Sequence, residues 1–131
     1  MIKSIHMAVL PHRQLRSYPD CGDWLVNEDN SPLVLCSADT GNDLSNLAIL
    51  LHEFVEAVWC WQNNVTEAEV TRFDKEWFTE HHHVDDEPGH DKRAPYHYGH
   101  LIAEKFEREF LNQFGRMWDH HSESINKLYA D

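Results

Sequence analysis

The chain has 131 residues, 41% of them hydrophobic, and a formal net charge of −12 from 23 acidic and 11 basic side chains. This length predicts a single domain over residues 1–131, and the acidity argues against binding to nucleic acids or anionic membranes. No apolar run approaches the roughly 18 residues that a membrane span needs. The short N-terminal apolar run is also too weakly charged for a signal peptide, so a cytoplasmic location is expected.

The first third of the chain predicts a small antiparallel sheet of two to three short strands. Residues 4–10 alternate loosely between apolar and polar, which is typical of a strand. Residues 24–26 and 33–36 form two more apolar runs. Asn30-Ser31-Pro32 lies between them and supplies turn-forming residues, so these two runs are expected to form a hairpin.

A helix of about twenty residues is predicted after Thr40-Gly41-Asn42-Asp43, which breaks the strand pattern and offers capping side chains. Apolar and polar residues then recur at the spacing of an amphipathic helix, whose apolar side normally faces the core. The apolar side holds Leu44, Leu47, Leu51, Phe54, Val58 and Trp61, and the opposite side holds Ser45, His52, Glu53, Glu56 and Asn63.

A second helix is predicted to begin at a capping box, in which Thr66 and Glu69 each satisfy a free backbone amide of the other. It should run to about Glu80. The buried residues expected in it are Val70, Phe73 and Trp77.

Residues 81–94 are rich in charges and contain Pro88 and Gly89, which indicates an exposed loop. A third helix is expected from near Pro95 to Gly115, with Phe106, Phe110 and Phe114 on its buried side, followed by a short last helix. Strands followed by helices indicate an α+β fold, in which three to four helices cover the small sheet.

The segment from His52 to Glu56 has the form H-E-x-x-E, which offers two metal ligands and a base. His52 and Glu56 are one helical turn apart, so an imidazole and a carboxylate project side by side. Glu53 could act as the general base on a metal-bound water, as in the H-E-x-x-H helix of zinc peptidases. Zinc accepts carboxylate oxygen in place of a second histidine. A polar face of this kind is, however, also typical of an ordinary solvated helix.

A second His-to-Glu pair lies one turn apart at His100 and Glu104, and His97 precedes it by one turn. If the first and third helices pack together, His100 or His97 supplies the third ligand. His52, Glu56 and His100 would then form a two-histidine, one-carboxylate site with positions left for water and substrate, suited to Zn²⁺ and, less well, to Fe²⁺ or another divalent metal. The alternative is that these are ordinary histidines at the start of a helix.

Two further features are weighed as possible parts of such a site. The loop His81–Asp91 is the densest cluster of ligand-type side chains, but ordering a loop costs entropy, so a solvated loop or a flap over the site is expected. Asp74 could support a ligand histidine from behind, although an exposed helix acid is the simpler interpretation.

Several short motifs together resemble a group of small, uncharacterised phage and prophage proteins. The motifs are Gly22-Asp23-Trp24, Leu51-His52-Glu53 with Glu56-Ala57, Arg72-Phe73-Asp74, Glu87-Pro88-Gly89, and Ala94-Pro95-Tyr96 through His100. The resemblance covers about residues 22–105 and implies a phage-associated protein of the host cytoplasm, without a known activity. A motif helix that follows a small sheet is also similar to a minimal zincin, by analogy of fold alone.

Three main functions remain open from the sequence, and an iron(II) oxygenase, which the same ligand set suits, is a fourth and weaker option. The first is a zinc-dependent, peptidase-like hydrolase that uses His52, Glu56, His100 and the base Glu53 on an unknown substrate. The second is a non-catalytic module in which a fourth ligand, Glu104 or His97, closes the metal shell. The third is an acidic interaction protein without metal, which would counter a host defence factor.

Overall fold

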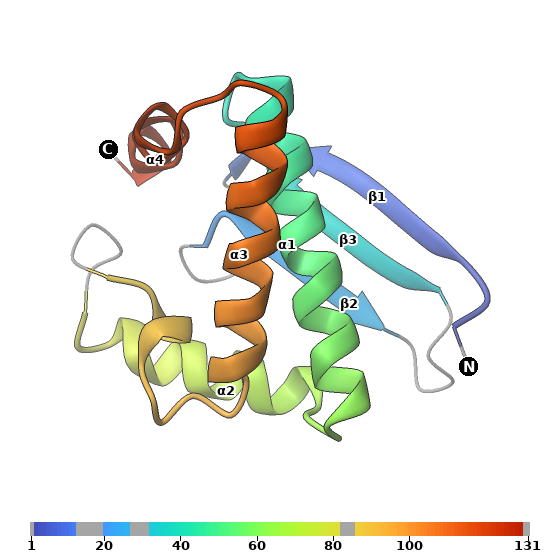
Figure 1. Cartoon of the computed structure of the whole chain (residues 1–131). Coiled ribbons are helices and arrows are strands. Elements are labelled where there is room, and N and C mark those ends of the chain that lie inside the picture. Colours follow the sequence, from blue (N-terminus) through green and yellow to red (C-terminus); the bar gives the residue numbers. More distant parts are fainter. Residues whose placement is uncertain (1, 13–19, 27–31, 82–85, 130–131) are drawn as a thin grey trace.

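The computed structural model describes residues 2–12, 20–26, 32–81 and 86–129. Its sheet has three strands, β1 (Ile5–Leu10), β2 (Gly22–Val26) and β3 (Leu33–Ala38), in the order β1-β3-β2 (Figure 1). β2 and β3 form the predicted antiparallel hairpin, with Trp24 opposite Leu35. β1, however, pairs with β3 in parallel.

The sheet is therefore mixed, and the expectation of a purely antiparallel sheet is wrong for one of its two pairings. The reason lies in the order of the strands. After β1 the chain does not turn back beside it but continues to the far side of β3, where it forms β2. The hairpin then places β3 between the other two strands, so β3 runs in the same direction as β1.

Four helices accompany the sheet, which confirms the α+β class. They are α1 (Asp43–Gln62), α2 (Glu67–Phe78), α3 (His97–Gln113) and α4 (Trp118–Asn126). Asn42 caps α1 by accepting from the amide of Ser45, and the capping box of Thr66 and Glu69 is present at the start of α2. None of the described helices is long and apolar enough to cross a membrane.

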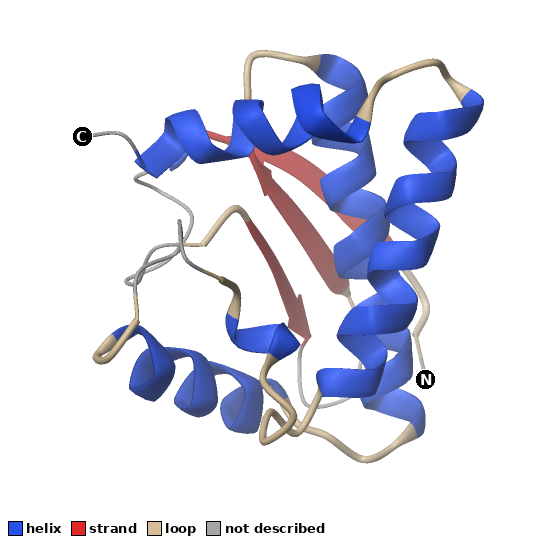
Figure 2. Ribbon diagram, turned by 60° about the vertical axis from the view of Figure 1, so that its left-hand side comes forward, coloured by secondary structure: helices blue, strands red, loops and turns tan. Residues whose placement is uncertain are grey.

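α1 and α3 lie side by side and run in opposite directions, and α1 also packs on β2 and β3 (Figure 1). Their close approach depends on Gly99, because a Cβ there would lie 2.7 Å from Cε3 of Trp59. α2 and α4 lie toward opposite ends of the molecule, with the short 3₁₀ turn Pro88–His90 between them (Figure 2).

The side that α1 buries combines apolar residues with most of its predicted polar face, contrary to the expectation from its amphipathic pattern. His52 is only 8% exposed, and Glu53 and Glu56 are also buried, whereas Leu47 and Trp61 remain 48% and 44% exposed. The inner side of α1 faces polar groups of α3 and α4 that complete its hydrogen bonds, as the contacts below show. Polar side chains can be buried when such partners are present.

The predicted phenylalanine stripe of α3 is likewise not in the core. Phe106 and Phe114 are 54% and 62% exposed, and Phe110 is half-buried. The residues that α3 buries are Gly99, His100, Ala103, Glu107 and Leu111. Small residues on this side let α3 approach α1, so the side with Ala103 and Glu107 is inside rather than the side with the largest apolar groups.

Candidate metal centre

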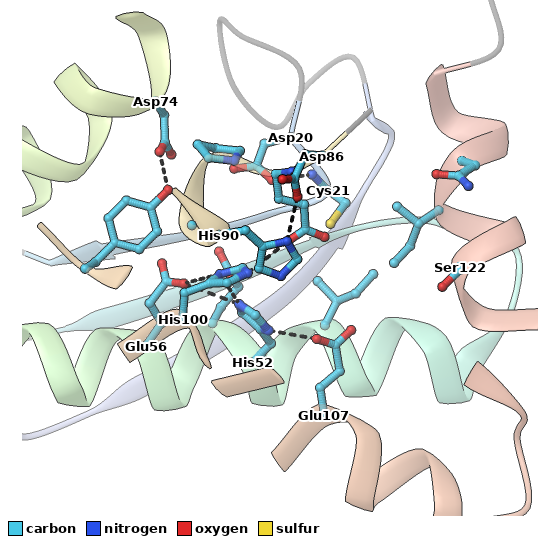
Figure 3. Close-up of a pocket in the computed structure, with 18 of the residues that line it drawn as sticks. Asp20, Cys21, His52, Glu56, Asp74, Asp86, His90, His100, Glu107 and Ser122 are labelled. Atoms are coloured by element: carbon cyan, nitrogen blue, oxygen red, sulfur yellow. Dashed lines mark hydrogen bonds and ion pairs between the residues drawn. The ribbon is translucent and has the colours of Figure 1, made fainter. Parts of the chain in front are cut away.

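Three predicted ligand atoms meet between α1 and α3. His52 Nε2 lies 3.3 Å from Glu56 Oε2 and 3.2 Å from His100 Nδ1, and His100 Nδ1 lies 3.2 Å from Glu56 Oε2 (Figure 3). The three atoms thus form a nearly equilateral triangle. Its sides match the edge, about 3.3 Å, of a tetrahedron whose ligands lie about 2.0–2.1 Å from a central zinc ion.

The other ring nitrogen of His52 is fixed by a buried hydrogen-bond chain. His52 Nδ1 donates to Glu107 Oε1 at 2.7 Å, and the second oxygen of Glu107 accepts from His121 Nε2 at 2.6 Å. His121 Nδ1 lies 2.9 Å from the hydroxyl of Ser45, which also accepts from Arg116 Nε at 2.6 Å. Because Nδ1 of His52 is bound to this carboxylate, Nε2 is the ring nitrogen that faces the triangle, as in carboxylate–histidine–metal arrangements.

Glu56 is held in a similar way from its outer side. Trp24 Nε1 donates to Oε1 of Glu56 at 3.3 Å, which leaves Oε2 facing the two histidines. Burial by itself would raise the pKa of Glu56, but hydrogen bonds from His100 and His52 lower it to about 2. Glu56 is therefore an ionised carboxylate, the form that binds a metal.

The histidines of the triangle carry the opposite shift. Burial would lower the pKa of His100, but its contacts with Glu56 and Glu87 raise it to about 10. Burial would also lower the pKa of His52, whereas the charge and hydrogen bond of Glu107 raise it well above its usual value. In the metal-free protein, protons on these rings thus balance the buried carboxylates, and a bound cation would take their place.

The turn Pro88–His90 covers His100 on the side away from α1. Gly89 allows this close approach, because a Cβ there would lie 2.3 Å from Cγ and 2.4 Å from Nδ1 of His100. Glu87 Oε2 lies 2.9 Å from His100 Nε2. Part of the expected solvated loop therefore belongs to the site. His82, His83 and Asp85 of that loop lie outside the described residues.

The triangle faces a cavity of about 260 Å³ with a strongly acidic lining. Seven carboxylates line it, and no lysine or arginine is among the described residues that do so. The carboxylates belong to Asp20, Glu53, Glu56, Asp74, Asp86, Glu87 and Glu107. Such a lining favours a cation over an anionic ligand.

The predicted base Glu53 is buried and lines the same cavity. It packs against Gly22 at the start of β2, where a Cβ would lie 2.8 Å from Cδ of Glu53. The absence of a side chain at Gly22 thus leaves room for the Glu53 carboxyl group beside the sheet.

The other two predicted ligands lie apart from the triangle. His97 Nδ1 donates to the carbonyl oxygen of Gly89 at 2.9 Å. Glu104 Oε2 lies 3.2 Å from His90 Nε2, and its other oxygen accepts from Arg108 at 3.3 Å. Neither belongs to the group of His52, Glu56 and His100 in which all ligand atoms lie within 4.8 Å of one another.

Asp74 is buried rather than exposed, and it accepts a short hydrogen bond from the hydroxyl of Tyr96 instead of supporting a ligand histidine directly (Figure 3). The tyrosine ring lies 6.3 Å from the ring of His100, centroid to centroid. Asp74 therefore holds the side chain of Tyr96 in place, and the ring of Tyr96 lies beside His100.

Sequence reasoning missed Glu107 and His121, and it placed Glu87 in a cluster expected to be a solvated loop or a flap. A signal for Glu107 exists, since Gly99, Ala103, Glu107 and Leu111 recur every fourth residue and so share one side of α3. His121 had no such signal, because it reaches the site from a separate helix whose placement depends on tertiary packing.

Comparison with known proteins gives no relative: no protein-family model, curated protein or solved structure matches the chain.

Proposed function

We propose that the protein binds a divalent transition metal, best zinc, through His52, Glu56 and His100, and that it is a zinc-dependent hydrolase. The observation that carries the metal proposal is the triangle of ligand atoms with sides of 3.2–3.3 Å. The hydrogen bonds from Trp24 and to Glu107 support it, because they orient two of the three ligands before any metal arrives.

The catalytic part of the proposal follows from the ligand count. Three protein ligands beside a cavity leave a coordination position for water or substrate, which is typical of catalytic rather than structural zinc sites. Zinc held there would supply Lewis-acid polarisation of a carbonyl group and activation of water. Glu53, which lines the same cavity, would accept the proton from the attacking water.

The resemblance to phage and prophage proteins adds a setting to this proposal. Five motifs carry the resemblance, and each contributes a residue to the cavity or a hydrogen bond to a residue that lines it. Trp24 bonds Glu56, and Asp74, Glu87 and His100 line the cavity. A function shared with such proteins would therefore act at this site, in the cytoplasm of a host cell and on a substrate or protein of that host.

Metal content tests the first part of the proposal. The full chain, purified without a nickel column, is expected to carry zinc in elemental analysis, and His52→Asn should lose it. Adding zinc at about 100 times the dissociation constant should stabilise the stripped protein by about 2.7 kcal/mol. Less than about 0.1 equivalent of any transition metal, together with no thermal shift, would refute metal binding.

The role of Glu53 tests catalysis separately from binding. Glu53→Gln should retain zinc but lose zinc-dependent hydrolysis of labelled casein or a chromogenic ester, by about 100-fold or more. The matched control is Glu109→Gln, an exposed acid of α3. Hydrolysis that is present and unaffected by Glu53→Gln would exclude this residue as the base. A zinc-bound protein without hydrolysis of either probe would favour a structural metal.

A further inference from the structure

His100 presents its two ring nitrogens to two different groups of ligand-type side chains. Nδ1 faces His52 and Glu56, as described above. Nε2 faces the turn Pro88–His90, where Glu87, His90 and His100 form a second group whose ligand atoms all lie within 4.8 Å of one another. Figure 3 shows the ring of His90 beside that of His100, with Asp86 bonded to His90.

The Nε2 atom of His100 gives an independent indication of a ligand on that side. It is buried and makes no hydrogen bond, although Glu87 Oε2 is only 2.9 Å away. This nitrogen and oxygen form an ion pair in the metal-free protein, and both are ligand-type atoms that one cation could contact in place of the proton. The other two ligands of the triangle do have hydrogen-bond partners for the atoms that point away from it. Glu107 accepts from Nδ1 of His52, and Trp24 donates to Oε1 of Glu56.

His90 is prepared for metal binding in the same way as His52. Its Nδ1 lies 2.7 Å from Asp86 Oδ1, a carboxylate that would hold the ring in place while Nε2 binds a metal. Nε2 in turn lies 3.2 Å from Glu104 Oε2, so a third carboxylate is near Glu87 and Asp86, and a bound metal would replace this contact. The ring of His90 meets that of His100 edge to face, with centroids 4.9 Å apart.

The charge of the cavity also exceeds what one metal would balance. Seven carboxylates line it without a lysine or arginine among the described lining residues. A single Zn²⁺ supplies two positive charges, fewer than the seven carboxylates of this lining would place around it. A second cation beside Glu87 and His90 would reduce the negative charge that remains in the cavity.

We propose that Glu87, His90 and Nε2 of His100 form a second divalent-cation site, so that the imidazole of His100 bridges two metals. The bridging part rests on the proposed function, since it requires metal at His52 and Glu56, whereas the second site can bind alone. With both metals bound, the ring of His100 carries no proton on nitrogen, and that proton goes to solvent. Glu87 keeps 38% of its side chain exposed and gives the second cation its path from solvent.

Metal stoichiometry of the stripped full chain tests the proposal, with Zn²⁺ as the probe in equilibrium dialysis and elemental analysis. Wild type should bind two equivalents, His90→Gln and His52→Asn one each, and His100→Ala none. His120→Gln, which alters an exposed histidine of α4, is the matched control and should retain two. Circular dichroism establishes that each variant is folded.

Cobalt distinguishes a bridge from two separate sites. With Co²⁺ in place of zinc, the paramagnetic resonance signal of the first equivalent should weaken when the second binds, because a shared imidazole couples the two ions, and His90→Gln should abolish this loss. One equivalent in wild type that His52→Asn removes and His90→Gln leaves unchanged would overturn the second site but keep the proposed function. No binding in wild type would overturn both, and two equivalents without coupling would overturn the bridge.

Discussion

Two sets of side chains on α1 and α3 contrast with each other. The buried polar set consists of Ser45, His52, Glu56, His100 and Glu107, and each member is less than a tenth exposed. The exposed apolar set consists of Leu47, Trp61, Ile102, Phe106 and Phe114, and each member is more than a third exposed. The same two helices therefore bury their ionisable groups while large apolar groups remain in contact with water.

Stability alone does not favour this arrangement. Burying a charged group costs several kcal/mol unless partners compensate it, whereas each exposed aromatic side chain forgoes part of the roughly 1.5–3 kcal/mol that full burial provides. The polar set is tolerated because its members hydrogen-bond one another across α1, α3 and α4. The contrast thus shows that hydrogen-bond partners, rather than apolar content, decide which side chains this helix pair buries.

The largest effect is expected when the polar set loses its central carboxylate. Glu107→Leu leaves His52 Nδ1 and His121 Nε2 buried without their acceptor, so the free energy of unfolding should fall by about 3–5 kcal/mol. Urea denaturation of the metal-free protein measures this. The adjacent Phe106→Leu, in the apolar set, should change stability by only about 0.5 kcal/mol. Equal losses in the two variants would contradict the contrast.

The dependence of stability on pH should come from the polar set and show two limits. The pKa values of Glu56 and Glu107 are lowered in the fold, so their contribution is present above about pH 4.5 and disappears as the pH falls through the folded values, about 2 for Glu56. The pKa of His100 is raised to about 10, so its contribution is present below pH 6.5 and disappears as the pH rises toward 10.

The metal-free protein should therefore be most stable between about pH 4.5 and 6.5 and lose on the order of a few kcal/mol by pH 10. Thermal unfolding across this range measures both limits. Zinc should remove the alkaline loss, because a cation replaces the proton on His100. Stability that is flat from pH 6.5 to 10 without metal would show that His100 is not protonated in the fold.

A smaller effect is expected from closing the space above His100. Gly89→Ala places a methyl group where the His100 ring lies, so the ring must shift and zinc affinity should fall by about 10–100-fold. This corresponds to about 1.4–2.7 kcal/mol of binding free energy. Titration calorimetry with zinc measures it. Pro95→Ala, an exposed position in the same segment, serves as the control, and equal affinities in the two variants would contradict the prediction.

The smallest effect is expected in the exposed apolar set. Phe114→Gln should change the free energy of unfolding by less than about 1 kcal/mol, since 62% of the residue is already exposed. The same change should reduce binding of a hydrophobic dye to the native protein. A loss as large as that of Glu107→Leu would mean that this ring is buried in solution and would remove one side of the comparison.

Local signals in the sequence determined much of the secondary structure. The capping box at Thr66, the break at residues 40–43 and Gly115, which has φ +76°, mark helix ends that depend on nearby residues alone. The same holds for the pairing of His52 with Glu56, because one helical turn separates them whatever surrounds the helix. His100 was also predicted as the third ligand, on the condition that α1 and α3 pack together.

Only the tertiary structure decided which side of each helix faces inward. Periodicity separates polar from apolar residues, but it does not reveal whether other segments bring hydrogen-bond partners to the polar side. Here Glu107 and His121 do so from α3 and α4, and Glu87 adds an ion pair with His100 from the residue that precedes the turn Pro88–His90. The hydrogen bonds from these partners offset the free-energy cost of burying His52 and Glu56. The small residues of α3 allow a close packing against α1 that its phenylalanines would have prevented.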